Sequence, residues 1–579
     1  MTPEDLARRL RAGEPFAGKT ITRFDLRGKQ LGGARLRGAK LKDIHLDEAD
    51  LAGSDLQDTQ WFRCPLRGAS LDRCDLRGAT FTGSDLRGAR LRGANLSGAK
   101  LLRANLAGAD LAGADLTATL LLGADLTGAR LTGAKLDRIR LDFAKLPGAE
   151  LAGAVLQGAS LNKADLTRAL LRDARITGST FYDARLGGAD LGGATLEKVV
   201  LVRADLRGAI LPKSMTRSVL DEARLDRPDL SGADLAASEL DGHDLAGVEL
   251  AGANLAGSSL RGTNLRNANL RGANLEQAML AGCDLTGAEL TGANLRRALL
   301  QGAILRGQRL AGADLEMTLL VDADLEGADL QGARLERAIL DGANLRGADL
   351  TRALLLQTLL RGAALDGVIL DKAIFDRVDL TGTDLQGVRL AGMTMTQCCF
   401  IEAKLAGMDL READFTGSNF TRADLRGADL RSSVLTRATL MEADLARADL
   451  SGATAKEAFF GDAALAGARA RDARLRRATF TRADLDHADL SGADLGDVVM
   501  RRARAARASF REARLAGADL SHADVSGADF QGADLDGANL HGLRDAEASW
   551  KGARLRGARR TDLDRLEAEA WSPPNEEPE

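Results

Sequence analysis

The residues able to act as metal ligands, bases or nucleophiles do not form a known motif in this sequence. The five histidines lie on separate stretches of the chain: His45, His243, His487, His522 and His541. HExxH, GxSxG, glycine-rich phosphate loops and EF-hand loops do not occur. The aspartates recur at one position of a short repeat, which favours solubilising surface residues over paired catalytic carboxylates. We therefore expect a protein that is not an enzyme, with no catalytic, cofactor-binding or metal site.

The five cysteines show neither a CxxC pair nor Cys/His ligand spacing. They are Cys64, Cys74, Cys283, Cys398 and Cys399. All except Cys399 occupy a position of the repeat that elsewhere holds a small residue. We expect those four to be buried thiols that pack as small apolar side chains. An odd number of cysteines without a framework fits a reducing compartment.

Composition and charge limit the classes of function. Charged residues make up 28% of the 579 residues and nearly cancel, giving a net charge of −4, which argues against a nucleic-acid binder. Basic residues exceed acidic ones over residues 1–200, and the opposite holds over residues 201–579. The first eleven residues are charged and amphipathic rather than a signal peptide, and no apolar run of membrane-spanning length occurs. These features predict a cytoplasmic protein without a membrane segment.

The elements that must position these residues follow from a repeat of five. Residues 413–450 read ADFTG SNFTR ADLRG ADLRS SVLTR ATLME ADLAR ADL, with a small residue first, a polar one second and Leu or Phe third. A period of five fits neither the 3.6 of a helix nor the 2 of a strand. Each unit must therefore end in a bend, and the object must repeat in whole units.

Bulky aromatic residues indicate how many units make one turn of that object. Phe400, Phe420, Phe460 and Phe480 are central residues of their units and differ by multiples of 20, and Phe510 and Phe530 repeat the interval. Trp61, Phe81 and Phe181 do the same earlier in the chain. Rings stacked above one another keep bulk in one corner of a narrow core. A turn of 20 residues contains four units, so we predict a square-sectioned solenoid.

The units resemble the A(D/N)LXX consensus of the pentapeptide repeat family, over roughly residues 16–555. The resemblance implies an all-β solenoid, a right-handed quadrilateral β-helix of about 27 coils, with the central residue and the small residue two before it facing inward. Neighbouring strands lie about 4.8 Å apart, so the rod would be on the order of 130 Å long. Short helices at both ends would cover the open strand edges.

The organisation along the chain follows from the repeat frame. We predict an N-terminal capping helix in residues 1–15, where Thr2 precedes Pro3, Glu4 and Asp5. The remaining parts are a first repeat frame over residues 16–211, a frame slip over 212–219, a second frame over 220–555, a capping helix over 556–571 and a disordered acidic tail over 572–579. The one-residue slip contains Pro212. It would either bend the rod or be absorbed as a local bulge.

Departures from the repeat are where a function would lie. The slot before the central residue points outward and is usually Asp or Asn. In the second frame apolar residues replace it most often on one of the four sides, and on five consecutive coils from Met279 to Leu359. The Gly before this slot is also replaced there, and Val321 adds another apolar group. We define the apolar stripe as Met279, Leu299, Met317, Leu319, Val321, Ile339 and Leu359.

The apolar stripe has two interpretations. It predicts a docking surface for a protein partner or a second copy of the chain, because contiguous exposed apolar patches mark interaction sites. Alternatively, branched apolar residues there stabilise strands through contacts along the flat sheet.

Three classes of function remain after these exclusions. The leading hypothesis is a non-catalytic, rod-shaped scaffold or adaptor for protein partners in the bacterial cytoplasm, with homodimerisation left open. Some pentapeptide repeat proteins resemble B-form DNA and act on DNA gyrase, which is the alternative hypothesis, although such a rod must be strongly anionic. A short helix followed by a long Leu-rich array also resembles proteins encoded with bacterial type VI secretion systems. Direct nucleic-acid binding and membrane association are not expected.

Overall fold

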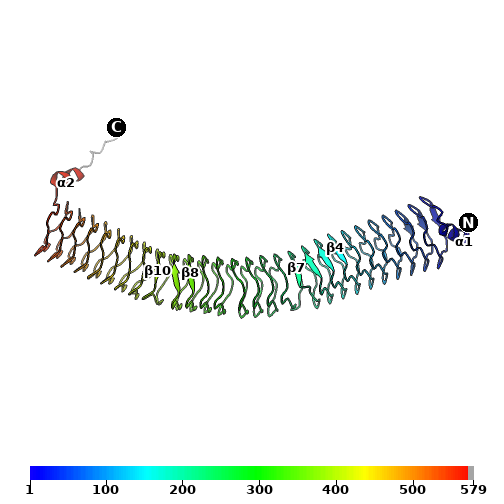
Figure 1. Ribbon diagram of the computed structural model, residues 1–579, viewed down its shortest axis with the longest axis horizontal. Helices are drawn as coiled ribbons and strands as arrows, with labels where there is room; N and C mark the ends of the chain where they lie inside the picture. The colour runs from blue at the N-terminus through cyan, green and yellow to red at the C-terminus, as the bar shows by residue number, and fades with distance from the viewer. Residues whose placement is uncertain (571–579) are drawn as a thin grey trace, which may run out of the picture. The chain divides into compact units, whose positions relative to one another are not determined.

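The computed structural model describes residues 1–570 of the chain. It contains two compact units, Met1–Leu295 and Arg296–Glu579, which we describe separately. The predicted tail over residues 572–579, and Trp571 at the end of the predicted C-terminal helix, lie outside the described residues. Figure 1 shows that each unit consists of short coils stacked one on the next. Among residues 1–570, no helix combines the length and the apolar character needed to cross a membrane.

Each coil is held to the next by parallel backbone pairing at a constant offset of 20 residues. Within one coil of the first unit the pairs are Arg90 with Asp110, Asn95 with Asp115, Lys100 with Leu120 and Asn105 with Asp125. Each pair lies on its own side of the coil, so the solenoid has four sides, as the aromatic spacing predicts. On the first of these sides, Leu91 N–H donates to Asp110 O at 2.6 Å, and Asp110 N–H donates to Ala89 O at 2.9 Å.

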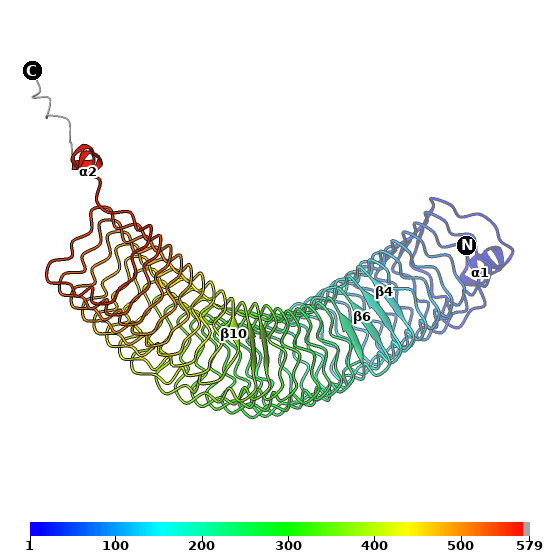
Figure 2. The ribbon, with the colours of Figure 1, turned by 60° about the vertical axis from the view of Figure 1, so that its left-hand side comes forward.

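Extended segments are short because every side of a coil is only one repeat long. Three sheets contain the named strands. The first unit holds β1 Thr20–Thr22, β2 Lys40–Lys42, β3 Gln60–Phe62, β4 Val155–Gln157, β5 Arg175–Thr177, β6 Thr195–Glu197 and β7 Ser214–Thr216. The second unit holds β8 Leu354–Leu356, β9 Ile374–Asp376 and β10 Met395–Thr396. In Figure 2, β4 and β6 lie on one face of the first unit, in a sheet in which β5 pairs with both of them.

The core is a set of columns that run through successive coils. Central Leu or Phe residues and the small residue two before them are buried almost throughout, as the repeat predicts. Aromatic residues 20 apart stack nearly parallel: the ring centroids of Phe400 and Phe420 lie 4.6 Å apart, and those of Trp61 and Phe81 lie 5.0 Å apart. The sequence inference of four units per coil is therefore confirmed by direct contact of the rings.

Helices lie at both ends. Helix α1, Pro3–Arg11, begins with a capping box between Thr2 and Asp5 and buries Leu6, Ala7 and Leu10 in the first unit. Helix α2, Leu563–Ala570, differs, because none of its residues is buried and Leu563 is 73% exposed. In Figure 2, α2 lies beyond the last coil. Burial of apolar side chains against the coil end, expected at both termini, occurs only at α1 among the described residues.

The one-residue frame slip is absorbed within the ladder. Asp190 pairs with Ile210 at the usual offset of 20, but Thr195 in β6 pairs with Ser214 in β7 at an offset of 19. The shortened corner therefore lies between Ile210 and Ser214, and Met215 in β7 is already a buried central residue. Pairing resumes at the offset of 20 between Ser214 and Asp234, so the ladder continues on the side of β7. In the described backbone it is interrupted between Ile210 and Asp229 and between Arg224 and Asp244.

Candidate docking surface

The apolar stripe is divided between the two units. Met279 belongs to the first unit, where it pairs with Ser259. The remaining members belong to the second unit, in which Leu299 pairs with Leu319, Leu319 with Ile339, and Ile339 with Leu359. Within the second unit the sequence prediction of consecutive apolar residues on one side is therefore confirmed. Whether partners dock on them stays a prediction.

Exposure distinguishes the members of the apolar stripe from one another. The ladder residues Met279, Leu299, Leu319, Ile339 and Leu359 and the neighbouring Val321 are half-buried, because side chains of adjacent coils cover one another. Met317 is 39% exposed and has a φ of 57°, in the left-handed region that favours Gly. A methionine at this turn position costs backbone strain of about 1 kcal/mol. Met317 is thus the most accessible apolar side chain of the stripe.

A second feature lies elsewhere in the second unit, where the ladder is interrupted on one side. Asp349 pairs with Ile369, and Asp409 pairs with Asp429. Between them, Arg389 forms no bridge, and the described backbone contains no hydrogen bond from Leu370 N–H to Arg389 O or from Leu390 N–H to Asp409 O. We name the interruption at Ile369, Arg389 and Asp409 the open seam. It leaves strand edges unpaired on this side of the second unit.

The inward small-residue slot explains the open seam. In this column the residue is Ala348 before the seam and Ala428 after it, but Val368, Val388 and Met408 on the three coils between. Three larger side chains in succession overfill a corner built for methyl groups, and overfilled cores shift the backbone. Isolated valines in the same slot, such as Val248 and Val498, leave the ladder intact, since Glu249 pairs with Asn269 and Val499 with Asp519. The stacking of large residues in one column therefore accompanies the break.

The open seam is also a cavity. Its volume is about 760 Å³, a size typical of ligand-binding clefts. Inward-facing side chains supply most of the apolar lining, namely Leu370, Phe375, Val388, Met393 and Met408, and the outward-facing Ile374 adds to it. Ile374 is 52% exposed at the rim, and Ile369, on the side of the break, is 44% exposed. Methionine side chains adapt to partners of different shape, so this lining suits an inserted apolar group.

Polar groups around the cavity are partly unpaired. Gln386 Nε2 donates to Ala406 O at 2.8 Å, in the place of a ladder bond that the Gly387 N–H does not make. Lys372 and Arg389 line the cavity, and neither forms an ion pair with any described residue. Asp409 at the same rim pairs with Arg411 at 2.6 Å, which lowers the pKa of its carboxyl to about 2. The rim therefore carries the charges of Lys372 and Arg389 and the carboxylate of Asp371, none of which forms an ion pair with a described residue.

The closed coils compensate their charges instead. Asp205 accepts two hydrogen bonds from Arg207, at 2.8 and 2.7 Å, and this lowers the pKa of the Asp205 carboxyl to about 2. Asp85 is contacted both by Arg87 in its own coil and by Arg67 in the preceding one. The outward aspartates are thus largely structural, and each also accepts a backbone N–H at its turn in many coils, such as Ala112 N–H to Asp110 at 3.2 Å.

Sequence reasoning missed the open seam because it followed the outward slot, where the apolar stripe lies. The inward slot holds the signal: three residues larger than Ala, spaced by 20, at positions 368, 388 and 408. It also treated the histidines as scattered. His522 and His541 are 19 residues apart, one short of a coil, and their ring centroids lie 5.2 Å apart. A search at the period of the coil, allowing one residue either way, identifies both features.

Comparison with known proteins gives a family and no close relative. The chain matches the family model described as "Pentapeptide repeats", which contains 8 copies of the unit. The matches cover residues 30–60, 63–212, 229–355, 358–497 and 503–542. No curated protein sequence matches this chain.

Three of the solved structures that match are pentapeptide repeat proteins or a fluoroquinolone resistance protein, each matched over part of this chain. A trypsin-treated QnrB1 variant, described as a plasmid-mediated fluoroquinolone resistance protein, is 18% identical, covers 34% of this chain and 96% of its own, and has a TM-score of 0.24. HetL from the cyanobacterium Nostoc, described as involved in heterocyst differentiation regulation, is 28% identical, covers 52% and 97%, and has a TM-score of 0.17. A thylakoid-lumen protein of Arabidopsis thaliana is 30% identical over 17% and 66%, with a TM-score of 0.12. These scores carry no argument about function.

Proposed function

We propose that this chain, which belongs to the pentapeptide repeat family, is a non-catalytic scaffold that binds a partner protein at the open seam. The observation that carries the proposal is the interruption of the ladder between Ile369 and Asp409, where core side chains line a cavity of about 760 Å³. In most coils the core side chains are covered by the neighbouring coils. An apolar, concave and partly charged surface in a regular solenoid supports this proposal, because such surfaces are typical of binding sites.

The non-catalytic assignment rests on how the polar residues are used. Outward aspartates are held by turn N–H groups and arginines, as Asp85 is by Arg67 and Arg87. Buried thiols are inert, since burial raises the pKa of Cys74 and Cys283 to about 12. Proteins of this family are generally structural repeat proteins, which supports the same assignment.

The partner's chemistry follows from the seam. Lys372 and Arg389 at the cavity lack acidic partners among the described residues, and an interface favours complementary charge. Ile374 and Met393 offer apolar contact beside them. The partner segment that fits carries a bulky apolar side chain with a carboxylate close by. The apolar stripe, with Met317 exposed, remains a second predicted docking surface.

The DNA-mimic alternative is less well supported by the surface. Mimicry of a DNA duplex requires an unbroken array of negative charge. Arginines contact the ladder carboxylates on many coils, for example Arg471 with Asp489 at 2.5 Å and Arg501 with Asp519 at 2.6 Å. A role as an accessory of a secretion system in the bacterial cytoplasm is supported only by the resemblance of the chain's opening to such proteins.

The test compares two isoleucines under the same substitution. Ile374→Asp places a charge at the rim of the open seam, and Ile304→Asp places one on a closed ladder, where Ile304 pairs with Asp324 and is 37% exposed. The full chain and both variants are used to capture proteins from the native host, with identification by mass spectrometry. We then expect the purified partner to bind the wild type and Ile304→Asp with equal affinity, and Ile374→Asp about tenfold or more weakly, the usual cost of a central interface residue.

The contrary outcome is equally specific. If the identified partner binds Ile374→Asp as tightly as the wild type, the open seam is not the docking site. Leu319→Asp and Ile339→Asp then test the apolar stripe. A supercoiling assay with DNA gyrase, in which the wild-type chain inhibits or protects the enzyme, would favour the mimic alternative instead.

A further inference from the structure

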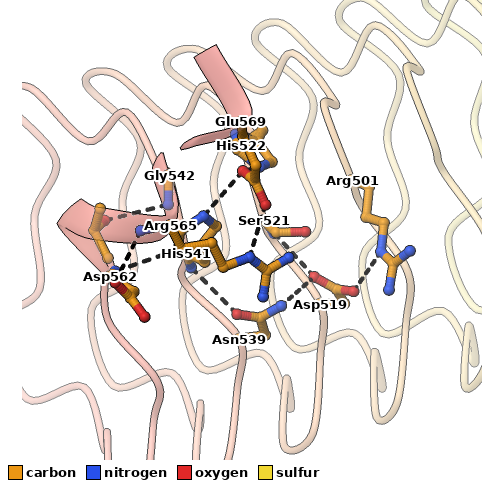
Figure 3. A network of polar contacts seen from close by, with 11 residues as sticks. Arg501, Asp519, Ser521, His522, Asn539, His541, Gly542, Asp562, Arg565 and Glu569 are labelled. Carbon is orange, nitrogen blue, oxygen red and sulfur yellow. Dashed lines mark hydrogen bonds and ion pairs between the residues drawn. The ribbon is translucent and has the colours of Figure 1, made fainter. Parts of the chain in front are cut away.

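A cluster of three possible metal ligands lies in the second unit, away from the open seam. His522 Nε2 is 3.0 Å from Glu569 Oε2, and His541 Nε2 is 3.1 Å from the same oxygen. One ligand atom from each of the three residues falls within 4.8 Å of the others. Figure 3 shows the two imidazoles and the carboxylate directed toward one another. Two of the five histidines in the chain therefore meet a carboxylate at one corner.

The solenoid positions both histidines through its turns. His522 is the second residue of its turn and has a φ of 59°. Its backbone N–H donates to His541 O at 2.8 Å, so the two residues stack on successive coils. The rings meet edge to face, with an angle of 86° between their planes. His541 is buried, and His522 is half-buried.

Helix α2 delivers the third residue and is tied to the last coils at its start. At its start, Gly542 N–H donates to Thr561 Oγ1 at 3.2 Å, and Asp562 accepts the Arg565 N–H at 3.1 Å as an N-cap. Near its end, Arg565 Nε donates to Glu569 Oε1 at 2.7 Å. That contact occupies one carboxylate oxygen and turns the other, Oε2, toward the imidazoles (Figure 3).

We propose that His522, His541 and Glu569 bind a divalent transition-metal ion, of which Zn²⁺ is the best fit. Two imidazoles and one carboxylate are a common ligand set for this ion, with bonds of about 2.0–2.2 Å. Tetrahedral bonds of that length place neighbouring ligand atoms about 3.3–3.6 Å apart. The 3.0 and 3.1 Å separations between the nitrogens and Oε2 need only a small expansion to admit the ion. The fourth position would take water.

The tautomer of His541 decides which ring proton must move when the metal ion binds. Asp562 N–H donates to His541 Nδ1 at 3.3 Å, so Nε2 carries the ring proton and donates it to Glu569. Metal binding at the two Nε2 atoms requires the proton of each neutral ring to lie on Nδ1, which it reaches through solvent. The long bond from Asp562 N–H then breaks, while the ion replaces the hydrogen bond from His541 to Oε2 and the 3.0 Å contact of His522 with the same oxygen. Loading therefore joins α2 to the coils through metal–ligand bonds, at the cost of the single contact from Asp562 N–H to His541.

Metal titration of the tag-free full chain, stripped with a chelator, tests the site. We expect one Zn²⁺ per chain by calorimetry, and visible ligand-field absorption when Co²⁺ is used as the probe. His522→Ala, His541→Ala and Glu569→Gln should each lower the Zn²⁺ affinity about tenfold or more, since even outer-shell changes cost that much. His487→Ala is the matched control, because His487 is also the second residue of its turn but lies outside the cluster, and it should leave the affinity unchanged.

Hydrogen exchange adds a readout of α2 itself. Zn²⁺ should slow exchange of the Leu566 amide, which bonds to Asp562 O at 3.0 Å, in the wild type but not in Glu569→Gln. If Zn²⁺ does not bind stoichiometrically, the proposal is wrong, and the three residues only form a polar contact between α2 and the coils. Unchanged affinity in either histidine variant or in Glu569→Gln overturns the three-ligand site, provided that thermal unfolding shows each variant folded. None of these outcomes depends on the open seam.

Discussion

The open seam and the coils that follow it in the same column differ by a few methyl groups. At the seam the inward slot holds Val368, Val388 and Met408, and the ladder at Arg389 is broken. Further along, Ala428, Ala448 and Ala468 fill the slot, and Asp429 pairs with Asp449 and Asp449 with Arg469. Parallel ladders tolerate little variation in coil spacing, because each hydrogen bond has a fixed length. The small residue therefore controls pairing of the backbone as well as filling of the core.

The largest expected effect is the loss of stability when a Phe of the closed coils is replaced by Ala, compared with the same replacement at the open seam. Phe420 stacks on Phe400 at 4.6 Å and meets Phe415 edge to face at 5.2 Å, so Phe420→Ala should lower the free energy of unfolding by roughly 3–5 kcal/mol. Phe375 already borders the seam cavity, so Phe375→Ala should cost clearly less. Urea unfolding measures both losses. Equal losses would show that the seam is packed as tightly as the closed coils.

Overfilling the closed column should create a second seam. Ala428→Val combined with Ala448→Met places bulk on two consecutive coils, and should lower the free energy of unfolding by roughly 1–3 kcal/mol. Exchange of the Leu430 amide, which donates to Asp449 O at 2.7 Å, should become faster. Ala428→Val alone is the control, since isolated valines such as Val498 leave the ladder intact. Unchanged exchange in the double variant would contradict column volume as the cause.

Repairing the seam is the reverse experiment. Val388→Ala with Met408→Ala restores the small residue on two coils, and should allow Leu370 N–H and Leu390 N–H to pair. We expect their exchange with solvent to slow by about tenfold or more, because exchange from a paired strand requires local opening. The free energy of unfolding should change little, since new hydrogen bonds offset lost apolar burial. If exchange stays fast, another feature of the region holds the ladder open.

Thiol labelling gives the smallest and most local comparison. Burial raises the pKa of both Cys74 and Cys398 to about 12, so neither thiol should react in the native state except through local opening. Cys398 lies in the coil next to the seam, whereas Cys74 lies among closed coils. Cys398 should therefore react faster than Cys74 with a neutral thiol reagent, as read by peptide mass spectrometry. The half-buried Cys399 serves as the reactive reference.

Much of the fold was predictable, because one short pattern is repeated many times. The Phe residues spaced by 20 predicted four sides from the sequence alone, and the ring centroids of Phe460 and Phe480 do lie 4.6 Å apart in a stacked arrangement. The apolar residues Leu299, Leu319 and Ile339 were placed on one side, and they pair in that order. Because every coil repeats the same local geometry, the position of one residue predicts the positions of the residues 20 apart from it along the chain.

The sites were less predictable, because they depend on contacts that the period alone does not specify. Nothing in Val368, Val388 or Met408 taken singly indicates a break, since Val248 occupies the same slot without one. The predicted capping helix over 556–571 was expected to cover open strand edges. In α2, Leu563 is 73% exposed, and Glu569 reaches the histidines.

By itself, the sequence determined the repeating unit, its four-sided coil, the inward columns and the outward polar slots, because each depends on a spacing along the chain. Only the tertiary structure decided where the ladder opens and which distant groups meet. The open seam arises from volume added across three coils, and the cluster of His522, His541 and Glu569 arises from the path of a helix after the last coil. Both depend on small displacements in three dimensions, which the spacing of residues along the chain does not specify.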